Sequence, residues 1–155
     1  MRRWTLASAL ACTACAQAFA HESEIRLLNP AKLFQPSTFS RLAVIGSGKL
    51  VPLSGQTARD TQSNIVGKGD VRAQTVQVFE NLKVALQSVE VDFDDVRKLT
   101  TFVVGLKPGD RVMIAEVIAQ YFPPGRRPAH TLVGIEALAL EDLLIEIEAI
   151  AVVPP

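Results

Sequence analysis

The sequence predicts an α+β subunit in which two helices pack on one face of a mixed sheet. Two stretches, near 70–89 and 108–122, have apolar residues at helical spacing. Five shorter stretches with the character of strands lie before, between and after them. The resulting order is ββαβαββ, in which both helices must bury their apolar sides on the sheet.

The first twenty residues are typical of a secretion signal. Arg2 and Arg3 precede an apolar run from Thr5 to Ala16, and Ala18-Phe19-Ala20 offers a small-x-small cleavage site. The run is too short to anchor the chain across a bilayer. We therefore expect cleavage after Ala20, no membrane insertion afterwards and a periplasmic or secreted protein. A cytosolic protein with an irregular N-terminal tail, or lipid attachment at one of the two cysteines, remains an alternative.

Cleavage would change the chemistry of the chain. Both cysteines, Cys12 and Cys15, would be lost with the signal, so the mature protein would have no thiol. Arg2 and Arg3 would go too, leaving 14 of the 16 basic residues against 16 acidic ones, a formal charge of −2. This balance argues against a nucleic-acid partner. No phosphate loop, zinc cluster or nucleophile elbow occurs, and we expect no metal and no cofactor.

The mature chain divides into an N-terminal extension, 21–38, and a single domain, 39–155. At about 135 residues it is long enough to bury about two thirds of its unfolded surface. Residues 39–45 and 50–54 predict two strands, and we interpret Gly46-Ser47-Gly48-Lys49 as the hairpin turn that joins them.

The two helices have clear boundaries. Asp70 is a plausible N-cap after the polar loop 56–69, and the second helix should begin near Pro108 or Gly109 and end before Pro123. The predicted apolar stripe of the first helix is Val71, Val78, Leu82, Ala85 and Val89. That of the second is Val112, Ala115, Ile118 and Phe122.

Three later strands are predicted at 96–104, 129–135 and 143–153. In the last one, Ile145, Ile147, Ala149 and Ala151 share one face, which suits helix packing. The opposite face has Leu144, Glu146, Glu148, Ile150 and Val152, an unusual mixture of carboxylates and large apolar groups. Either a partner chain closes over this face, with a glutamate at a cleft, or it is a solvent-exposed face with scattered apolar residues.

Five segments, in order, match one family. They are 53–56 (LSGQ), 74–82 (QTVQVFENL), 95–103 (DVRKLTTFV), 128–133 (PAHTLV) and 145–152 (IEIEAIAV). The chain thus resembles the Rid (YjgF-type) enamine/imine deaminases from about Phe39 to Val153. The resemblance implies a chorismate-mutase-like subunit that assembles as a homotrimer with three clefts between neighbouring subunits.

The resemblance also implies a substrate site, and several residues of this site differ from those of the family. Glu146 matches the glutamate that orients the hydrolytic water, and Ser54 and Gly55 match the pocket turn. His130 stands where the family has the arginine that grips a substrate carboxylate, and Thr131 follows it. Three other substrate-binding positions are altered: Phe39 for tyrosine, Ala115 for asparagine and Leu132 for cysteine.

The arginine position decides what the pocket can hold. Arginine pairs with a carboxylate through a planar fork of donors, and histidine cannot. His130 should be mostly neutral at pH 7 unless a neighbour such as Glu146 raises its pKa. Arg126 or Arg127 would restore the missing contact if either reaches the cleft; otherwise both are solvated turn residues.

These observations predict a trimeric protein that binds a small metabolite, with weak or no ordinary 2-imino acid deaminase activity. As an imine or enamine hydrolase, it would use Glu146 to position water and His130 to polarise or protonate the substrate. The alternative is a catalytically silent metabolite-binding trimer. RNA cleavage, attached to some relatives, is a further alternative that the acidic charge disfavours.

Overall fold

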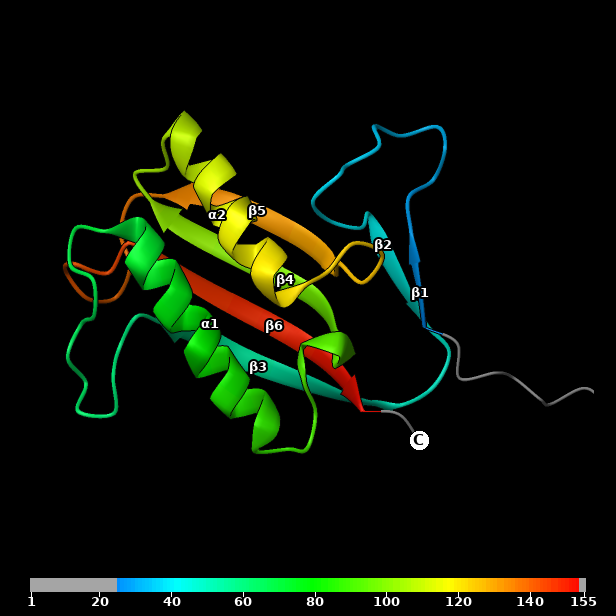
Figure 1. Cartoon of the computed structure of the whole chain (residues 1–155), viewed down its shortest axis with the longest axis horizontal. Coiled ribbons are helices and arrows are strands. Elements are labelled where there is room, and N and C mark those ends of the chain that lie inside the picture. The colour runs from blue at the N-terminus through cyan, green and yellow to red at the C-terminus, as the bar shows by residue number, and fades with distance from the viewer. Residues whose placement is uncertain (1–24, 154–155) are drawn as a thin grey trace, which may run out of the picture.

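The computed structural model describes residues 25–153 and has a four-stranded sheet with two helices on one face (Figure 1). Its strand order is β3-β6-β4-β5, where β4 and β5 run parallel and the other neighbours run antiparallel. The strands are β3 (Lys49–Thr57), β4 (Val96–Val104), β5 (Ala129–Ile135) and β6 (Ile145–Val153). The predicted fold class is confirmed. The predicted secretion signal, 1–20, lies outside the described residues and stays a prediction.

Both helices form close to where the sequence places them, although α1 ends at Gln87 and leaves Val89 of the predicted stripe outside the helix and 43% exposed. Helix α1 (Val71–Gln87) begins after Asp70, whose carboxylate accepts hydrogen bonds from the backbone of Arg72 and Ala73 at 2.9 and 3.0 Å. Helix α2 (Pro108–Tyr121) has proline in its first turn and ends before the Pro123-Pro124 pair. Within the described part of the chain, neither helix is long and apolar enough to cross a membrane.

The apolar stripe of α2 differs from the predicted one. Ile114, Val117 and Ile118 are its buried residues, whereas Val112 is 62% exposed and Ala115 is only partly buried. The predicted row was therefore wrong in part. The physical reason is that α2 has apolar residues on two sides, and spacing alone does not say which side meets the sheet.

The core lies between α1, α2 and the sheet face that they cover, here called the helix-covered face. Ile145, Ile147, Ala149 and Ala151 are all 2% exposed or less, so the predicted inner face of β6 is confirmed. Gln74 of α1 is also fully buried. Its side-chain amide donates to the Asp142 carbonyl at 2.7 Å and accepts from the Leu144 backbone at 2.8 Å, which ties α1 to the start of β6.

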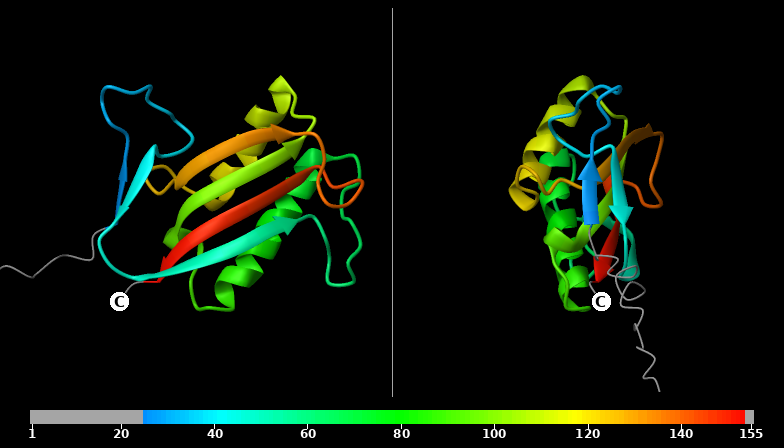
Figure 2. Two further views of the ribbon diagram at one scale, coloured as in Figure 1. Left: turned by 180° about the vertical axis from the view of Figure 1, so that it is seen from behind. Right: turned by 90° about the vertical axis from the view of Figure 1, so that its right-hand side faces the viewer.

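The predicted hairpin of residues 39–54 is wrong. Strand β2 (Leu42–Ile45) pairs with β1 (Ile25–Leu28) in a separate two-stranded sheet, while β3 pairs with β6. Gly48, at φ +123°, turns the chain onto the end of β6, where an added Cβ would lie 2.6 Å from the Val153 carbonyl oxygen. We call residues 25–45 the N-terminal arm, which stands beside the main sheet in Figures 1 and 2.

Candidate functional site

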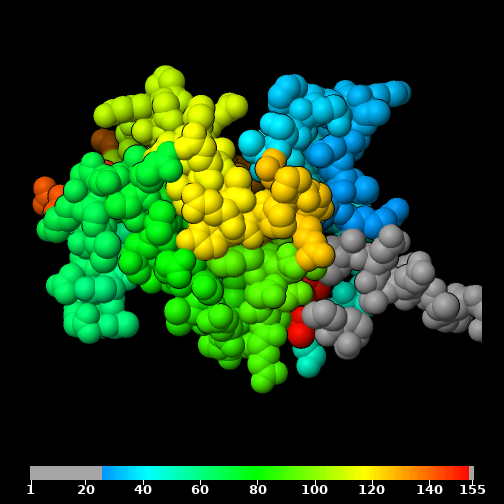
Figure 3. Space-filling view, in the orientation of Figure 1, coloured from blue at the N-terminus to red at the C-terminus, as the bar shows by residue number. Residues whose placement is uncertain are grey.

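A pocket of about 700 Å³ opens between α2, β5 and the N-terminal arm. The space-filling view shows the hollow between the arm, in blue to cyan, and α2, in yellow-green to yellow (Figure 3). The arm is held there because Ser40 bonds to the start of β5, through its backbone to the Pro128 carbonyl at 3.0 Å and through its hydroxyl to the Arg127 carbonyl at 2.7 Å.

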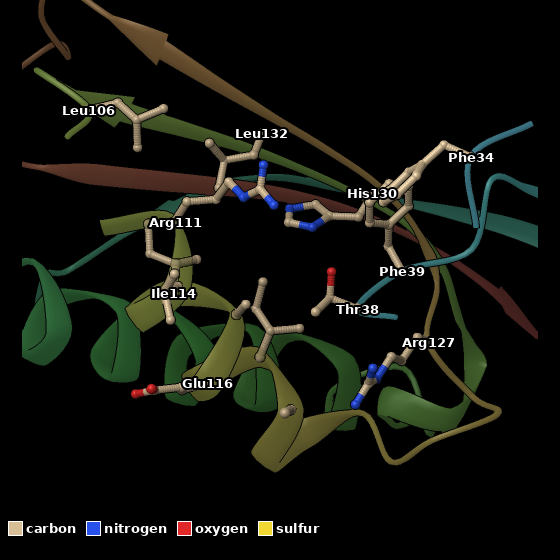
Figure 4. A pocket seen from close by; sticks show the side chains of 14 residues that line it. Phe34, Thr38, Phe39, Leu106, Arg111, Ile114, Glu116, Arg127, His130 and Leu132 are labelled. Atoms are coloured by element: carbon tan, nitrogen blue, oxygen red, sulfur yellow. The ribbon is translucent and has the colours of Figure 1, made fainter. Parts of the chain in front are cut away.

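Four of the predicted substrate-binding or catalytic residues line this pocket. They are Phe39 of the arm, Ala115 of α2, and His130 and Leu132 of β5 (Figure 4). His130 and Leu132 alternate with Thr131 along the strand, so they point to the helix side and Thr131 to the other. Exposed Thr131 instead accepts a hydrogen bond from the Lys98 ammonium at 2.6 Å.

His130 is a neutral group at physiological pH. Its Nε2 lies 2.9 Å from the hydroxyl of fully buried Thr101. Burial, with a smaller contribution from the positive charge of Lys98, lowers the pKa of His130 from 6.5 to about 4. This agrees with the expectation that His130 is mostly neutral at pH 7, and within one chain Glu146 does not raise its pKa.

Glu146 lies on the opposite side of the sheet. We call this side the open face because neither α1 nor α2 covers it (Figure 2, left). Its neighbours Ile145 and Ile147 are fully buried under the helices, so alternation turns Glu146 away from them. His130, by contrast, pairs in register with Leu99, which faces the helices. The structure thus does not bring His130 and Glu146 together within one chain.

The Ser54-Gly55 turn and Glu146 are brought together. The pairing of β3 with β6 shifts between Leu53 and Gln56, which places Ser54 and Gly55 in a β-bulge. Gly55 packs so closely on Glu146 that an added Cβ would overlap its carboxylate. A second group of predicted residues, Ser54, Gly55 and Glu146, is therefore assembled on the open face.

Of the two arginines considered from the sequence, one reaches the pocket and the other does not. Arg126 forms an ion pair with Asp94 outside this pocket, whereas Arg127 lines the pocket. Arg111 of α2 also lines it and was missed. The available signal was its place four residues before Ala115, which puts both on one side of the helix.

The chain matches a known family over most of its length. The family model described as endoribonuclease L-PSP matches residues 33–153. The RutC family protein PH0854 of Pyrococcus horikoshii is 36% identical over 107 residues, which cover 69% of this chain and 82% of that protein. Protein DfrA of Myxococcus xanthus is 38% identical over 114 residues, which cover 74% and 84%.

Solved structures of similar proteins have the same fold. A Rid-family protein of unknown function, YyfB of Yersinia pestis, matches with a TM-score of 0.78 and 36% identity over 83% of this chain and 98% of that one. Rv2704 of Mycobacterium tuberculosis, from the YjgF/YER057c/UK114 family, matches with a TM-score of 0.57 and 30% identity over 74% and 86%.

Proposed function

Because the chain belongs to the endoribonuclease L-PSP family, with Rid and YjgF-type proteins among its relatives, we propose that it is a homotrimer that binds a small metabolite in clefts between subunits. The observation that carries this proposal is the separation of the two residue groups. His130 and Leu132 open on one side of the sheet, and Ser54, Gly55 and Glu146 on the other. A complete site then needs the pocket of one chain and the open face of another.

The open face supports the association. Leu50 of β3, Val133 of β5 and Ile150 of β6 are 61%, 40% and 37% exposed, and the strand register puts all three on the same face of the sheet as Glu146. Several exposed large apolar side chains on one sheet face are typical of an interface rather than of a solvated surface. A partner chain would bury them and remove water from the Glu146 carboxylate.

In such a cleft, the chemistry would be hydrolysis of a carbon–nitrogen double bond. Glu146 would orient a water and accept its proton as the oxygen attacks the imine carbon, and would then return that proton to the nitrogen. Transfer of the remaining hydroxyl proton to the nitrogen as the carbon–nitrogen bond breaks would release ammonia and a carbonyl compound. Neutral His130 would hydrogen-bond to the substrate but would not act as a strong acid. If turnover is absent, the same cleft is a metabolite-binding site. We also propose that the protein acts outside the cytoplasm, as its first twenty residues predict.

Sedimentation velocity of the purified protein tests the assembly. We expect a trimer for the wild type and a shift to monomer for Ile150→Asp, because a charge would be buried at the interface. Val84→Asp is the matched control: Val84 is 67% exposed on α1, on the other side of the molecule, and its replacement should leave the trimer intact. A wild-type monomer would refute the proposed cleft.

Turnover of 2-iminopropanoate and of bulkier imines tests the chemistry. Any hydrolysis should fall by at least about a hundredfold in Glu146→Gln, the usual size of a general-base effect. Glu148→Gln, an exposed carboxylate two residues along the same face, should keep the wild-type rate. Equal loss in both variants would remove the assignment of Glu146, and binding without turnover would favour the silent trimer.

A further inference from the structure

The pocket on the helix side combines apolar walls with two arginines that form no ion pair among residues 25–153. Phe39, Leu106 and Leu132 supply carbon surface, and Glu116 is the acidic residue that lines it. Glu116, however, is ion-paired with Arg72 on the exposed side of the helices. Its charge is thus already compensated. The charged groups of the pocket that can still bind a ligand are the guanidinium groups of Arg111 and Arg127.

Arg111 is the better placed of the two lining arginines. It lies one turn before Ala115, on the side of α2 that faces the pocket, and its side chain extends along the pocket toward the His130 imidazole (Figure 4). Among residues 25–153, its guanidinium has neither an ion-pair partner nor a hydrogen-bond acceptor. Five donors in a planar fork are therefore free for a ligand.

His130 complements this cation without adding charge. Its Nε2 is occupied by Thr101, so Nδ1 is the ring atom left for a ligand. The nearby Lys98 ammonium bonds to Thr131 on the open face and to the Leu99 carbonyl, so it is engaged elsewhere. An anionic ligand group next to the imidazole would thus find its countercharge at Arg111.

From these contacts we propose that Arg111, on α2, is the residue that selects the ligand of this pocket by charge, because its guanidinium holds the carboxylate of a small apolar molecule beside His130. The inference deepens the proposed function, on which it rests, by naming the residue that would decide ligand specificity. The fork of Arg111 matches two carboxylate oxygens, and the apolar walls match a hydrocarbon or aromatic body. Arg111 then provides from a helix the cation that position 130 lacks.

Calorimetric titration with matched acids and amides tests this. The probes are phenylacetate against phenylacetamide and hexanoate against hexanamide, which differ in charge but little in shape. We expect the wild type to bind each acid ten- to a hundredfold more tightly than its amide, the usual effect of a charge-assisted contact. Arg111→Gln should abolish this preference. Arg126→Gln should keep it, since Arg126 pairs with Asp94 outside the pocket.

Three outcomes would overturn the assignment: no binding by either acid, equal binding of acid and amide to the wild type, or loss of the preference in Arg127→Gln but not in Arg111→Gln. The result is separable from the assembly test, because Arg111 and His130 belong to one chain. A monomer that still prefers acids removes the intersubunit cleft and keeps the role of Arg111. A trimer that binds a ligand without preferring acids keeps the intersubunit cleft and removes the role of Arg111.

Discussion

The two faces of the main sheet are formed by the same strands but differ in how accessible their side chains are. On the helix-covered face, β6 presents Ile145, Ile147 and Ala149, all essentially inaccessible. On the open face, the same strand presents Glu146, Glu148 and Ile150, which stay partly or largely accessible. The first face is completed by α1 and α2 of its own chain. The second has no such cover within residues 25–153, and the proposed assembly would cover it with another copy of the chain.

The largest expected effect comes from exchanging one isoleucine on each face. Ile147→Ala should lower the free energy of unfolding by about 3 to 4 kcal/mol, because it leaves a cavity in a fully packed site. Ile150→Ala should cost the monomer about 1 kcal/mol or less, since Ile150 is 37% exposed. Urea titration at several protein concentrations measures both. Similar costs at concentrations where the chain is monomeric would show that the faces do not differ.

A pH titration of stability tests the burial of His130 at the edge of the helix-covered face. Its pKa is 6.5 in the unfolded chain and about 4 in the fold, so the unfolded chain binds more protons between these values. The contribution is therefore fully present above pH 6.5 and is lost as the pH falls toward 4. It amounts to at most about 3 kcal/mol.

His130→Asn should flatten the pH dependence of the unfolding free energy in this window. Urea unfolding of both proteins from pH 4 to 7.5 measures this dependence. The protonation of other groups, which the two proteins share, cancels when their unfolding free energies are subtracted. An unchanged slope would mean that His130 is protonated in the folded protein, which would also restore the option that it acts as an acid.

A smaller loss of stability is expected from replacing Gln74, the buried polar residue that ties α1 to the start of β6. Gln74→Leu leaves the Asp142 carbonyl and the Leu144 amide without their present partner, so it should cost about 2 kcal/mol in thermal or urea unfolding. Gln87→Leu, exposed at the end of the same helix, is the control and should change stability little. If the two variants are equally stable, water replaces Gln74 and the contact is not structural.

The sequence is informative where the physics is local. The cap at Asp70 and the prolines around α2 set helix boundaries through backbone hydrogen bonding, and β4 and β5 occupy the predicted residues. The candidate residues are also recognisable from motifs. What motifs miss is Arg111, because it lies on a helix outside the matched segments and reaches the pocket only in the folded chain.

The sequence by itself determined the two helices, strands β4 to β6, the inner face of β6 and the family to which the chain belongs. It did not predict β1. Only the tertiary structure decided that β2 pairs with β1 and that His130 and Glu146 lie on opposite faces. Alternation fixes which residues of one strand share a face. It does not fix how one strand is registered against another, because that depends on contacts between segments far apart in the chain.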